Sequence, residues 1–479
     1  MGNLFSALGT AGESLKALET GLTVTQNNVT NANTPGYADQ VPVFDSLSFQ
    51  PQSGLLGGVR EQTQDTTNQF AETAVQQQTS LLGQYQQLQT SLAPLQNVFD
   101  VSANSPIPSA LNQLFQSFSD WSASPADPTA QNAVLSAASQ VSAAFQQSAN
   151  QLDSIRSATD GNIQSTVTQI NQDAALIQGY NATIGKAATP DAGVEAQLTS
   201  TIENLSSLAN VQVIRGNDNT VTVLLGGQTP LVIGNQVNAL QVQPENTTGA
   251  LNPSGAPNTE ILDSSGNNVT SQVTSGSLAA LLSVRNSLLP SLAGGADQTG
   301  ELNVLAKSIA DAVNSLQTRG STTSTPPYQA GAPLFTYDVT SPTDSASTLA
   351  VNSSITGTQL APVETGPPLV SNGNALNLAN LASSSQINGQ NFTQYFGSMV
   401  ATVGNAAAAA NTQATAQQSM LTQAQSLRQQ LSGVSLDEEA IRLVQLQRSY
   451  QASRHLGVCY VFDLACVVVP LNSTPRPHN

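Results

Sequence analysis

Apolar residues recur at every third or fourth position through the first 29 residues, and this spacing constrains the fold more than any other feature of the chain. The steps alternate between four and three residues, which is the a and d pattern of a helix that packs against another helix. The positions are Leu4, Leu8, Ala11, Leu15, Leu18, Leu22, Thr25 and Val29. Interspersed glycines give such a helix little intrinsic stability in water. The sequence therefore predicts a terminal helix that depends on a partner.

A dense group of turn-forming residues ends this ladder. Asparagine favours turns and caps, Pro35 disfavours helix at Thr34, and Gly36 can adopt a positive φ angle. We therefore expect the helix to stop here, in a joint that leads into the rest of the chain. The predicted joint motif consists of Asn31, Asn33, Thr34, Pro35, Gly36 and Tyr37.

The charge of the chain argues against two classes of partner. Its 479 residues include 13 Lys and Arg against 30 Asp and Glu, which gives a formal net charge of -17. That sign opposes binding to a phosphate backbone or to an anionic bilayer surface. The most apolar run, Val458 to Val469, is too short to span a bilayer. We expect neither nucleic-acid binding nor membrane insertion.

The N-terminus and the cysteines bear on localisation. The N-terminus lacks the basic segment and the unbroken apolar run of a cleaved signal peptide, so any export is expected to occur without one. The two cysteines, Cys459 and Cys466, both lie near the C-terminus. No disulfide framework or thiolate metal site is therefore expected to organise the body of the chain.

Helical spacing continues through the first part of the middle region. A second ladder runs from Leu81 to Phe99, and Pro94 is expected to kink or end that helix near Ala93. A further ladder from Ile163 to Ile184 includes Asn181, and an Asn at such a position can set the register between packed helices. This ladder fits either a helix packed inside its own domain or an intermolecular seam, and the frequency of the pattern in helical bundles favours the first.

The sequence changes character at Val211, where β-branched residues begin to alternate along the chain. Turn residues at Gly216 to Asn219 and at Gly226 and Gly227 divide this part into a meander of short predicted strands. Helical spacing returns from Leu278. We expect a mainly α fold with a β insertion, elongated and multi-domain. The predicted segments are a helix and joint (1–36), helical rod (37–210), outer β module (211–275), returning helices (276–320), an irregular or β segment (321–372), a rod helix (373–431) and a C-terminal helix with an atypical tail (432–479).

Catalytic chemistry has little support in the sequence. The only histidines are His455 and His478, and no phosphate-binding or dinucleotide glycine motif is present. Three consecutive acids, Asp437 to Glu439, could suggest a metal or acid/base site. Helix capping explains them more simply, because Ser435 followed by Glu438 fits a capping box and acids favour a helix N-terminus. We therefore expect no catalytic residues, no metal and no cofactor.

Both ends resemble one family of proteins. The segment "LTVTQNNVTNANTPGY" looks like the N-terminal signature of bacterial flagellar axial proteins, and "SGVSLDEEAIRLVQLQRSYQASRHL" resembles the C-terminal signature of the flagellar hook-associated protein 1 family, the hook-filament junction proteins. The segments "SVRNSLLPSL" and "LAKSIADAVNSL", followed by "PLF", are similar to that family's middle region. The basic residue usual after the joint Tyr is replaced here by Ala38 and Asp39.

The resemblance implies a structural role. In this family the terminal helices pack together in the wall of the flagellar tube, so the N-terminal ladder would meet a C-terminal one. The implied N-terminal seam is Leu4, Leu8, Leu15, Leu18, Leu22 and Val29, and the implied C-terminal seam is Leu436, Ala440, Leu443, Leu446 and Tyr450. The implied location is the extracellular flagellum. The implied partners are further copies of the chain, the hook protein, the second hook-filament junction protein, an export chaperone and the secretion apparatus.

The C-terminal tail departs from the family pattern, and several rival functions stay open on the sequence alone. After Leu456 the family's amphipathic helix gives way to "GVCYVFDLACVVVPLNSTPRPHN", which either a lineage-specific tail or a shifted reading frame would explain, and the terminal helix is expected to be shorter. The rival functions are another flagellar axial protein of the hook or rod, an exported adhesin-like binding module, and an enzyme such as a wall hydrolase. A hydrolase would need a convergent acid pair or metal cluster, and the sequence contains no such signal.

Overall fold

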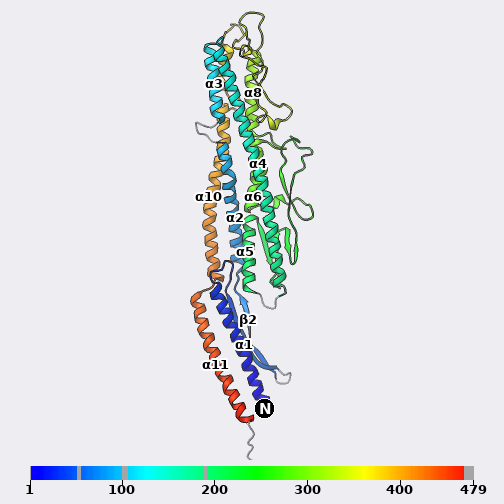
Figure 1. Cartoon of the computed structure of the whole chain (residues 1–479), viewed down its shortest axis with the longest axis vertical. Coiled ribbons are helices and arrows are strands. Elements are labelled where there is room, and N and C mark those ends of the chain that lie inside the picture. Colours follow the sequence, from blue (N-terminus) through cyan, green and yellow to red (C-terminus); the bar gives the residue numbers. More distant parts are fainter. Residues whose placement is uncertain (1, 51–54, 100–105, 187–190, 469–479) are drawn as a thin grey trace, which may run out of the picture.

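The computed structural model describes residues 2–50, 55–99, 106–186 and 191–468, with side chains described in these ranges except at 2–8, 47–50, 55–58 and 456–468. The molecule is elongated, with a pair of terminal helices at one end, a long helical bundle beyond them, and strands and loops along one side of the bundle (Figure 1). The predicted class, mainly α with β insertions, is confirmed. Among the described residues, no helix is both long and apolar enough to cross a membrane.

The terminal pair consists of α1, Gly2–Asn31, and α11, Leu436–Val468, which pack side by side and run in opposite directions (Figure 1). A hairpin of β1, Gln40–Gln50, and β2, Leu55–Asp65, also packs on α1. The prediction of a helical segment from residue 37 was wrong for this hairpin, because packing against α1 stabilises strands that the local pattern does not indicate. The shortening expected after Leu456 was also wrong, since α11 continues to Val468.

The helical rod surrounds a large apolar core in which Trp121, Phe118, Phe145 and Phe396 are almost completely buried. Its main helices are α2 (Gln69–Val98), α3 (Pro106–Ala123), α4 (Pro128–Ile184), α8 (Glu301–Arg319), α9 (Gly373–Asn380) and α10 (Phe392–Ser432). Pro94 was expected to kink or end α2 near Ala93, and the end was wrong, because the helix continues past Pro94 for one more turn. Only one backbone hydrogen bond is lost so near the end, and the flanking leucines are buried in the core.

Helix α4 connects the rod to the outer module. It has 57 residues, so it extends about 86 Å at 1.5 Å per residue. Its first half packs in the rod core, and its second half, from Ile163, packs in a separate apolar core. There Asn181 is buried and binds backbone groups of Val221 and Gly234 at 2.8 to 2.9 Å. The interpretation of this ladder as packing inside the chain is therefore confirmed.

The outer module begins with strand β3 at Val211, where the sequence predicts the change. Its four-stranded antiparallel sheet has the order β3-β4-β5-β6, and β7 pairs with β8. Helix α5 (Ala192–Leu208) precedes the module. The elements of the module are β3 (Val211–Arg215), β4 (Val221–Leu225), β5 (Thr229–Ile233), β6 (Gln236–Val237), β7 (Gln241–Pro244), β8 (Thr259–Leu262) and the 3-10 turn η2 (Thr270–Gln272). This sheet covers the second half of α4.

The chain then returns to the rod and forms a second irregular region. The returning elements are α6 (Gly276–Ser283), the π-helical turn η3 (Val284–Leu288) and α7 (Leu289–Ala293), followed by α8. The irregular region contains β9 (Phe335–Thr336), which pairs with β10 (Ala350–Val351), and the 3-10 turns η4 (Pro342–Asp344) and η5 (Gly357–Gln359). The expected 373–431 helix is divided into α9 and α10 by a turn.

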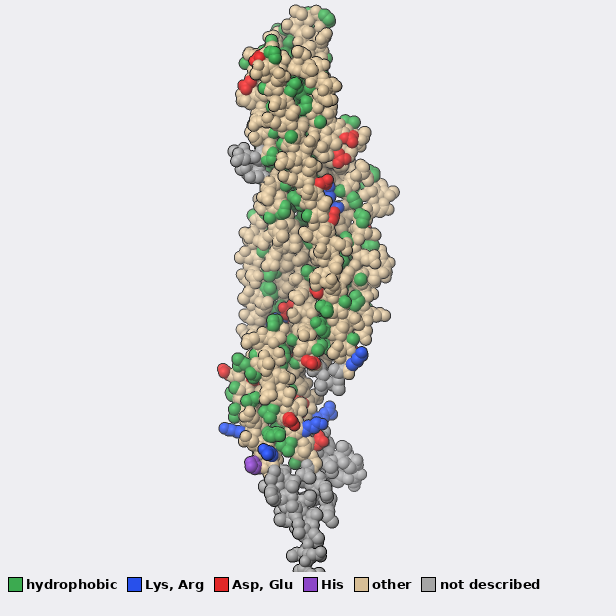
Figure 2. Space-filling model, viewed as in Figure 1, with side chains coloured by type: hydrophobic (Ala, Val, Ile, Leu, Met, Phe, Trp, Pro, Cys, Tyr) green, Lys and Arg blue, Asp and Glu red, His purple; other side chains and the backbone are tan. Residues whose placement is uncertain are grey.

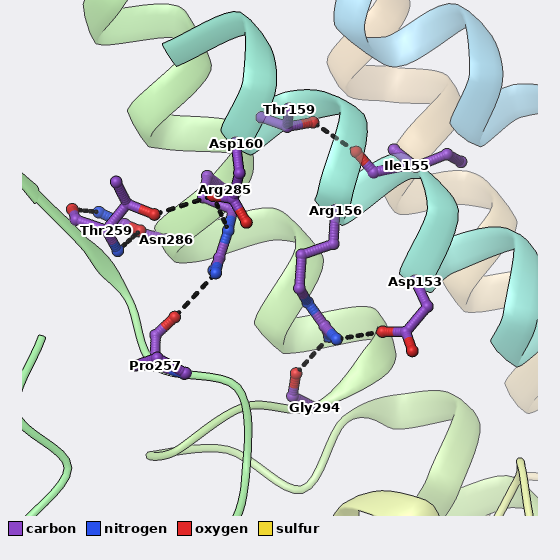
Figure 3. Close-up of polar contacts among 10 residues, drawn as sticks. All are labelled: Asp153, Ile155, Arg156, Thr159, Asp160, Pro257, Thr259, Arg285, Asn286 and Gly294. Carbon is purple, nitrogen blue, oxygen red and sulfur yellow. Dashed lines mark hydrogen bonds and ion pairs between the residues drawn. The ribbon is translucent and has the colours of Figure 1, made fainter. Parts of the chain in front are cut away.

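Two arginines, of which Arg285 is buried, connect α4 to the chain that follows the outer sheet (Figure 3). Arg285, on the π-helical turn η3, donates from Nε to Asp160 Oδ1 at 2.6 Å and from Nη2 to the Pro257 carbonyl at 2.9 Å. Arg156, on α4, pairs with Asp153 and donates to the Gly294 carbonyl at 2.8 Å. Each guanidinium therefore links an acid on α4 to a backbone carbonyl, and the contact of Arg285 with Pro257 holds the outer module against the rod.

Candidate assembly site

The joint after α1 is organised by Asn28, whose side chain is completely buried. Its amide nitrogen donates to Asp39 Oδ1 at 2.7 Å and to the Gln40 carbonyl at 2.8 Å. Its amide oxygen accepts from the Tyr37 hydroxyl at 2.9 Å and from the Gln40 backbone amide at 3.2 Å. One side chain thus ties the last turn of α1 to the start of β1 and uses its donors and acceptor fully.

Ser432, at the end of α10, holds the rod side of the same joint. Its carbonyl accepts from the Asp39 backbone amide at 2.8 Å. Its hydroxyl accepts from the Asn68 backbone amide at 3.0 Å and donates to the Thr66 carbonyl at 3.1 Å. Asn68 in turn caps α2. The end of α10, the hairpin and the start of α2 therefore meet at one serine.

The predicted joint motif packs on the rod through its glycine. Gly36 has φ of +77°, and a Cβ there would lie 2.7 Å from the Ala196 carbonyl oxygen of α5. Both the backbone angle and this close approach require glycine. Thr34 and Tyr37 close the turn, since Thr34 N donates to Asn31 O at 2.8 Å and Tyr37 N donates to Thr34 O at 3.1 Å. Asn33 and Pro35 are exposed, so their contribution in the monomer is limited to the turn itself.

Acidic side chains from the start of α11 and from the segment after α1 lie close together at the joint. Glu439 is almost completely buried and pairs with Arg442, whose Nη1 also lies 3.9 Å from Asp39 Oδ1. Burial raises the pKa of the Asp39 carboxyl, Glu439 raises that pKa further, and Arg442 opposes the shift. Burial, with Asp39 and Glu439, raises the pKa of the Tyr37 hydroxyl to about 12. A single guanidinium therefore stabilises two neighbouring carboxylates.

The buried face of α1 is not the predicted leucine seam. The residues that α1 buries are small or polar with one exception, and they are Ala17, Gly21, Val24, Thr25 and Asn28. At 3.6 residues per turn, the leucine ladder lies about 100° around the helix from this face. Leu15, Leu18 and Leu22 are half-buried, Val29 is 45% exposed, and the side chains of Leu4 and Leu8 lie outside the described residues.

The predicted seam of α11 is divided in the same way. Leu446 is buried, and its methyl groups lie 3.5 to 3.6 Å from the position of a Cβ on Gly21. Tyr450 and Leu443 are half-buried, whereas Leu436 is 53% exposed and Ala440 is exposed. The two helices pack against each other as expected, but Leu446 meets a glycine rather than a leucine ladder. A small residue on α1 allows this close approach.

The unburied parts of the two ladders meet in a groove between the helices. This groove has a volume of about 490 Å³ and is mainly apolar. Its lining residues are Gln26, Val29, Thr30, Leu436, Glu439, Ala440 and Leu443. Four of these were predicted as seam residues, and the structure brings them together side by side, facing outward. The arrangement can bind an apolar side chain or helix from another molecule, and it contains no arrangement for covalent chemistry among its described residues.

The predicted cap and the alternative chemical sites can be located as well. Ser435 Oγ accepts from the Glu438 backbone amide at 3.4 Å, which is the hydrogen bond expected of an N-cap. Within the described ranges, no three His, Cys, Asp or Glu side chains are placed to hold a metal ion. His455 is exposed, and His478 and the side chains of both cysteines lie outside the described residues.

Sequence reasoning missed Asn28, Gly21 and Glu439 as site residues. For the two residues on α1, the signal is a polar or glycine residue repeated at helical spacing beside an apolar ladder, as in Gly21, Thr25 and Asn28. Such a stripe indicates that a helix makes a close or hydrogen-bonded contact in addition to its apolar one.

Comparisons with known proteins agree on one family. Residues 92–335 match the family model described as the flagellar hook-associated protein FlgK helical domain. A flagellar hook-associated protein 1 from Bacillus subtilis (strain 168) is 24% identical over 504 aligned residues, covering 95% of this chain and 96% of the relative. The protein of the same name from Salmonella typhimurium is 25% identical over 334 residues, covering 66% of this chain and 57% of the relative.

A solved structure has the same fold. The flagellar hook junction protein FlgK from Burkholderia pseudomallei superposes with a TM-score of 0.61, covering 75% of this chain and 99% of that one, at 18% identity. At this identity the likeness concerns the fold alone.

Proposed function

This chain belongs to the family of the flagellar hook-associated protein FlgK, and from that premise we propose that it is the structural subunit that joins the flagellar hook to the filament. The family model matches residues 92–335, about half of the chain, and a relative of this name aligns along almost the whole chain. The role is mechanical: the chain holds its neighbours in place through helix faces.

The observation that carries this proposal is the outward-facing apolar groove at the joint end of the terminal pair. Its apolar residues, Val29, Leu436 and Leu443, have no partner that fills the groove within the described part of the chain. Apolar side chains left exposed together mark an interaction site. Figure 2 shows hydrophobic side chains gathered just below the joint, on an otherwise mostly uncharged surface. The groove supports assembly through the terminal helices.

The partners and location follow as parts of the same proposal. The groove accepts a further copy of this chain, and the rings above and below are the hook protein and the second hook-filament junction protein. An export chaperone and the secretion apparatus handle the chain before assembly, and the assembled protein is extracellular. Export occurs without a cleaved signal peptide. We also propose 1–36 and 432–479, with the hairpin at 40–65, as the axial part, and the segments between them as rod and outer modules.

A pair of substitutions on α11 tests the proposal. Leu443→Asp places a carboxylate in the groove, where burial against a neighbour would cost on the order of several kcal/mol. We expect normal export and a normal melting curve for the purified monomer, but loss of attached filaments and release of flagellin into the medium. Ser449→Asp, an exposed position on another side of α11, is the matched control and should retain filaments.

Two outcomes would count against the proposal. Stable filaments in cells that carry Leu443→Asp would exclude the groove as the assembly element. A clearly lowered melting temperature of the purified variant would assign Leu443 to the core of the monomer instead.

A further inference from the structure

A second unpartnered stripe lies on the opposite side of α11 from the helix pair contact. It consists of Asp437, Ile441, Val444 and Arg448, which follow one another at steps of four, three and four residues. Residues at this spacing share one face of a helix. Ile441 is 60% exposed and Val444 is 46% exposed, and the buried Leu446 points toward α1. We call these four residues the outer stripe.

Two of the groove residues belong to a stripe on α1 that has a similar spacing and extends beyond the groove. Gln26 and Val29 line the groove, and Glu19 and Leu22 precede them at steps of three and four residues. Leu22 is half-buried and Glu19 is exposed. These four residues form the groove stripe.

The two stripes lie on different faces of one molecule, so a chain cannot fill its own groove with its own outer stripe. We infer that the outer stripe of one copy occupies the groove stripe of the next copy. Such a contact joins two different surfaces, and repeated contacts of this kind build rings or helical tubes rather than closed pairs. The inference rests on the proposed function and specifies which surface meets which.

A pairing of Arg448 with Glu19 favours one direction of the contact. Leu446 of α11 lies on Gly21 of α1, so Arg448 and Glu19 are at nearly the same level of the antiparallel pair. In the proposed contact the two copies are parallel, and Ile441 and Val444 of one copy pack against the groove stripe of the other. Arg448 of the first copy then lies at the same height along the helices as Glu19 of the second. Among the described residues, neither side chain has an ion-pair partner within its own chain. The contact thus has an apolar centre and a charged rim.

Cysteine cross-linking in intact flagella tests this arrangement. The background is the full chain with Cys459→Ser and Cys466→Ser, and the test variant carries Val29→Cys and Ile441→Cys together. Oxidation should give a ladder of multimers beyond the dimer on a denaturing gel, because each chain offers one thiol to each neighbour. The variants that carry only Val29→Cys or only Ile441→Cys are the controls and should remain monomeric.

The controls also separate this inference from the proposed function. Disulfide dimers from Ile441→Cys alone would show that outer stripes pair with each other and would overturn the inference. Flagella that assemble normally but give no ladder would overturn it too, while leaving the junction role intact. If the chain that carries only Cys459→Ser and Cys466→Ser were absent from flagella, the proposed function itself would be overturned.

A charge exchange provides a second test that does not depend on cysteine. Arg448→Glu should cause loss of attached filaments because it opposes Glu19 of the neighbour, and adding Glu19→Arg should restore them. The purified variants should melt like the unmodified protein, since both positions are exposed. If Glu19→Arg fails to rescue Arg448→Glu, the proposed direction of the contact is wrong.

Discussion

The rod and the terminal pair are both helical, but their helices are held together by different kinds of contact. The rod buries Trp121, Phe118 and Phe145 in a continuous apolar core. The terminal pair buries Gly21, Asn28 and other small or polar residues, and leaves much of its leucine ladder half-exposed. Burial of large apolar side chains stabilises a fold by itself, whereas hydrogen bonds add modest net free energy. We therefore expect the rod to be stable alone, and we propose that assembly completes the terminal pair.

The largest effect should come from the rod core. Trp121→Ala removes a fully buried indole and its hydrogen bond to the Pro125 carbonyl, and should lower the free energy of unfolding by about 3 to 5 kcal/mol. Calorimetry of the purified chain measures this. Phe70→Ala, at an exposed aromatic on α2, is the control and should change the melting temperature little. A small effect of Trp121→Ala would mean that the rod is not the stable unit.

The attachment of the outer module should give an intermediate effect. Arg285→Gln removes the pairing with Asp160 and the hydrogen bond to Pro257, and should cost about 2 kcal/mol, the range of hydrogen bonds to charged groups. Faster amide exchange near residues 257–262, with the rod helices unchanged, is the expected result. Lys307→Gln, which removes an exposed ion pair with Asp311, is the control and should be nearly silent. Equal loosening throughout the chain would contradict a local role.

The joint should respond locally. Asn28→Ala leaves the Tyr37 hydroxyl and the Gln40 backbone groups without their partner, at a cost of about 1 to 3 kcal/mol for a buried unsatisfied group. We expect faster amide exchange in the last turns of α1 and at residues 37–40, with unchanged melting of the rod. Asn27→Ala, at the exposed neighbouring position, should have no such effect. If Asn28→Ala also lowered the melting temperature of the rod, the rod and the terminal pair would unfold as one cooperative unit, contrary to this prediction.

The smallest effect should be the pH dependence of the joint. Burial and Glu439 raise the pKa of Asp39 above its ordinary value of 3.8, so the folded joint favours the protonated carboxyl. The stability is therefore greatest below the unfolded pKa and falls as pH rises through the higher folded pKa. Amide exchange at residues 37–40 should be slower below pH 3.8 than at pH 7, after correction for the intrinsic rate. Asp39→Asn should remove most of this difference, and the opposite trend would show that pairing with Arg442 dominates.

Several features could be predicted because they depend on local sequence. The spacing of the leucines predicts the terminal helices, Pro35 and Gly36 predict the joint, and the alternation from Val211 predicts the first strand of the outer module. The hairpin at residues 40–65 could not be predicted in this way, since α1 supplies the surface on which its strands pack. The same holds for α2 beyond Pro94, where burial of the neighbouring leucines offsets one lost hydrogen bond.

The sequence by itself determined which residues are apolar and at what spacing, because helical periodicity and turn chemistry are properties of neighbours along the chain. Only the tertiary structure decided which side of each terminal helix is used within the monomer. Gly21 lets Leu446 approach closely, and Asn28 fixes the end of α1 by four hydrogen bonds, so the small and polar stripe becomes the inner face. Close packing and hydrogen bonding require contacts between distant residues, and those contacts leave most of the described leucine ladder only half-buried.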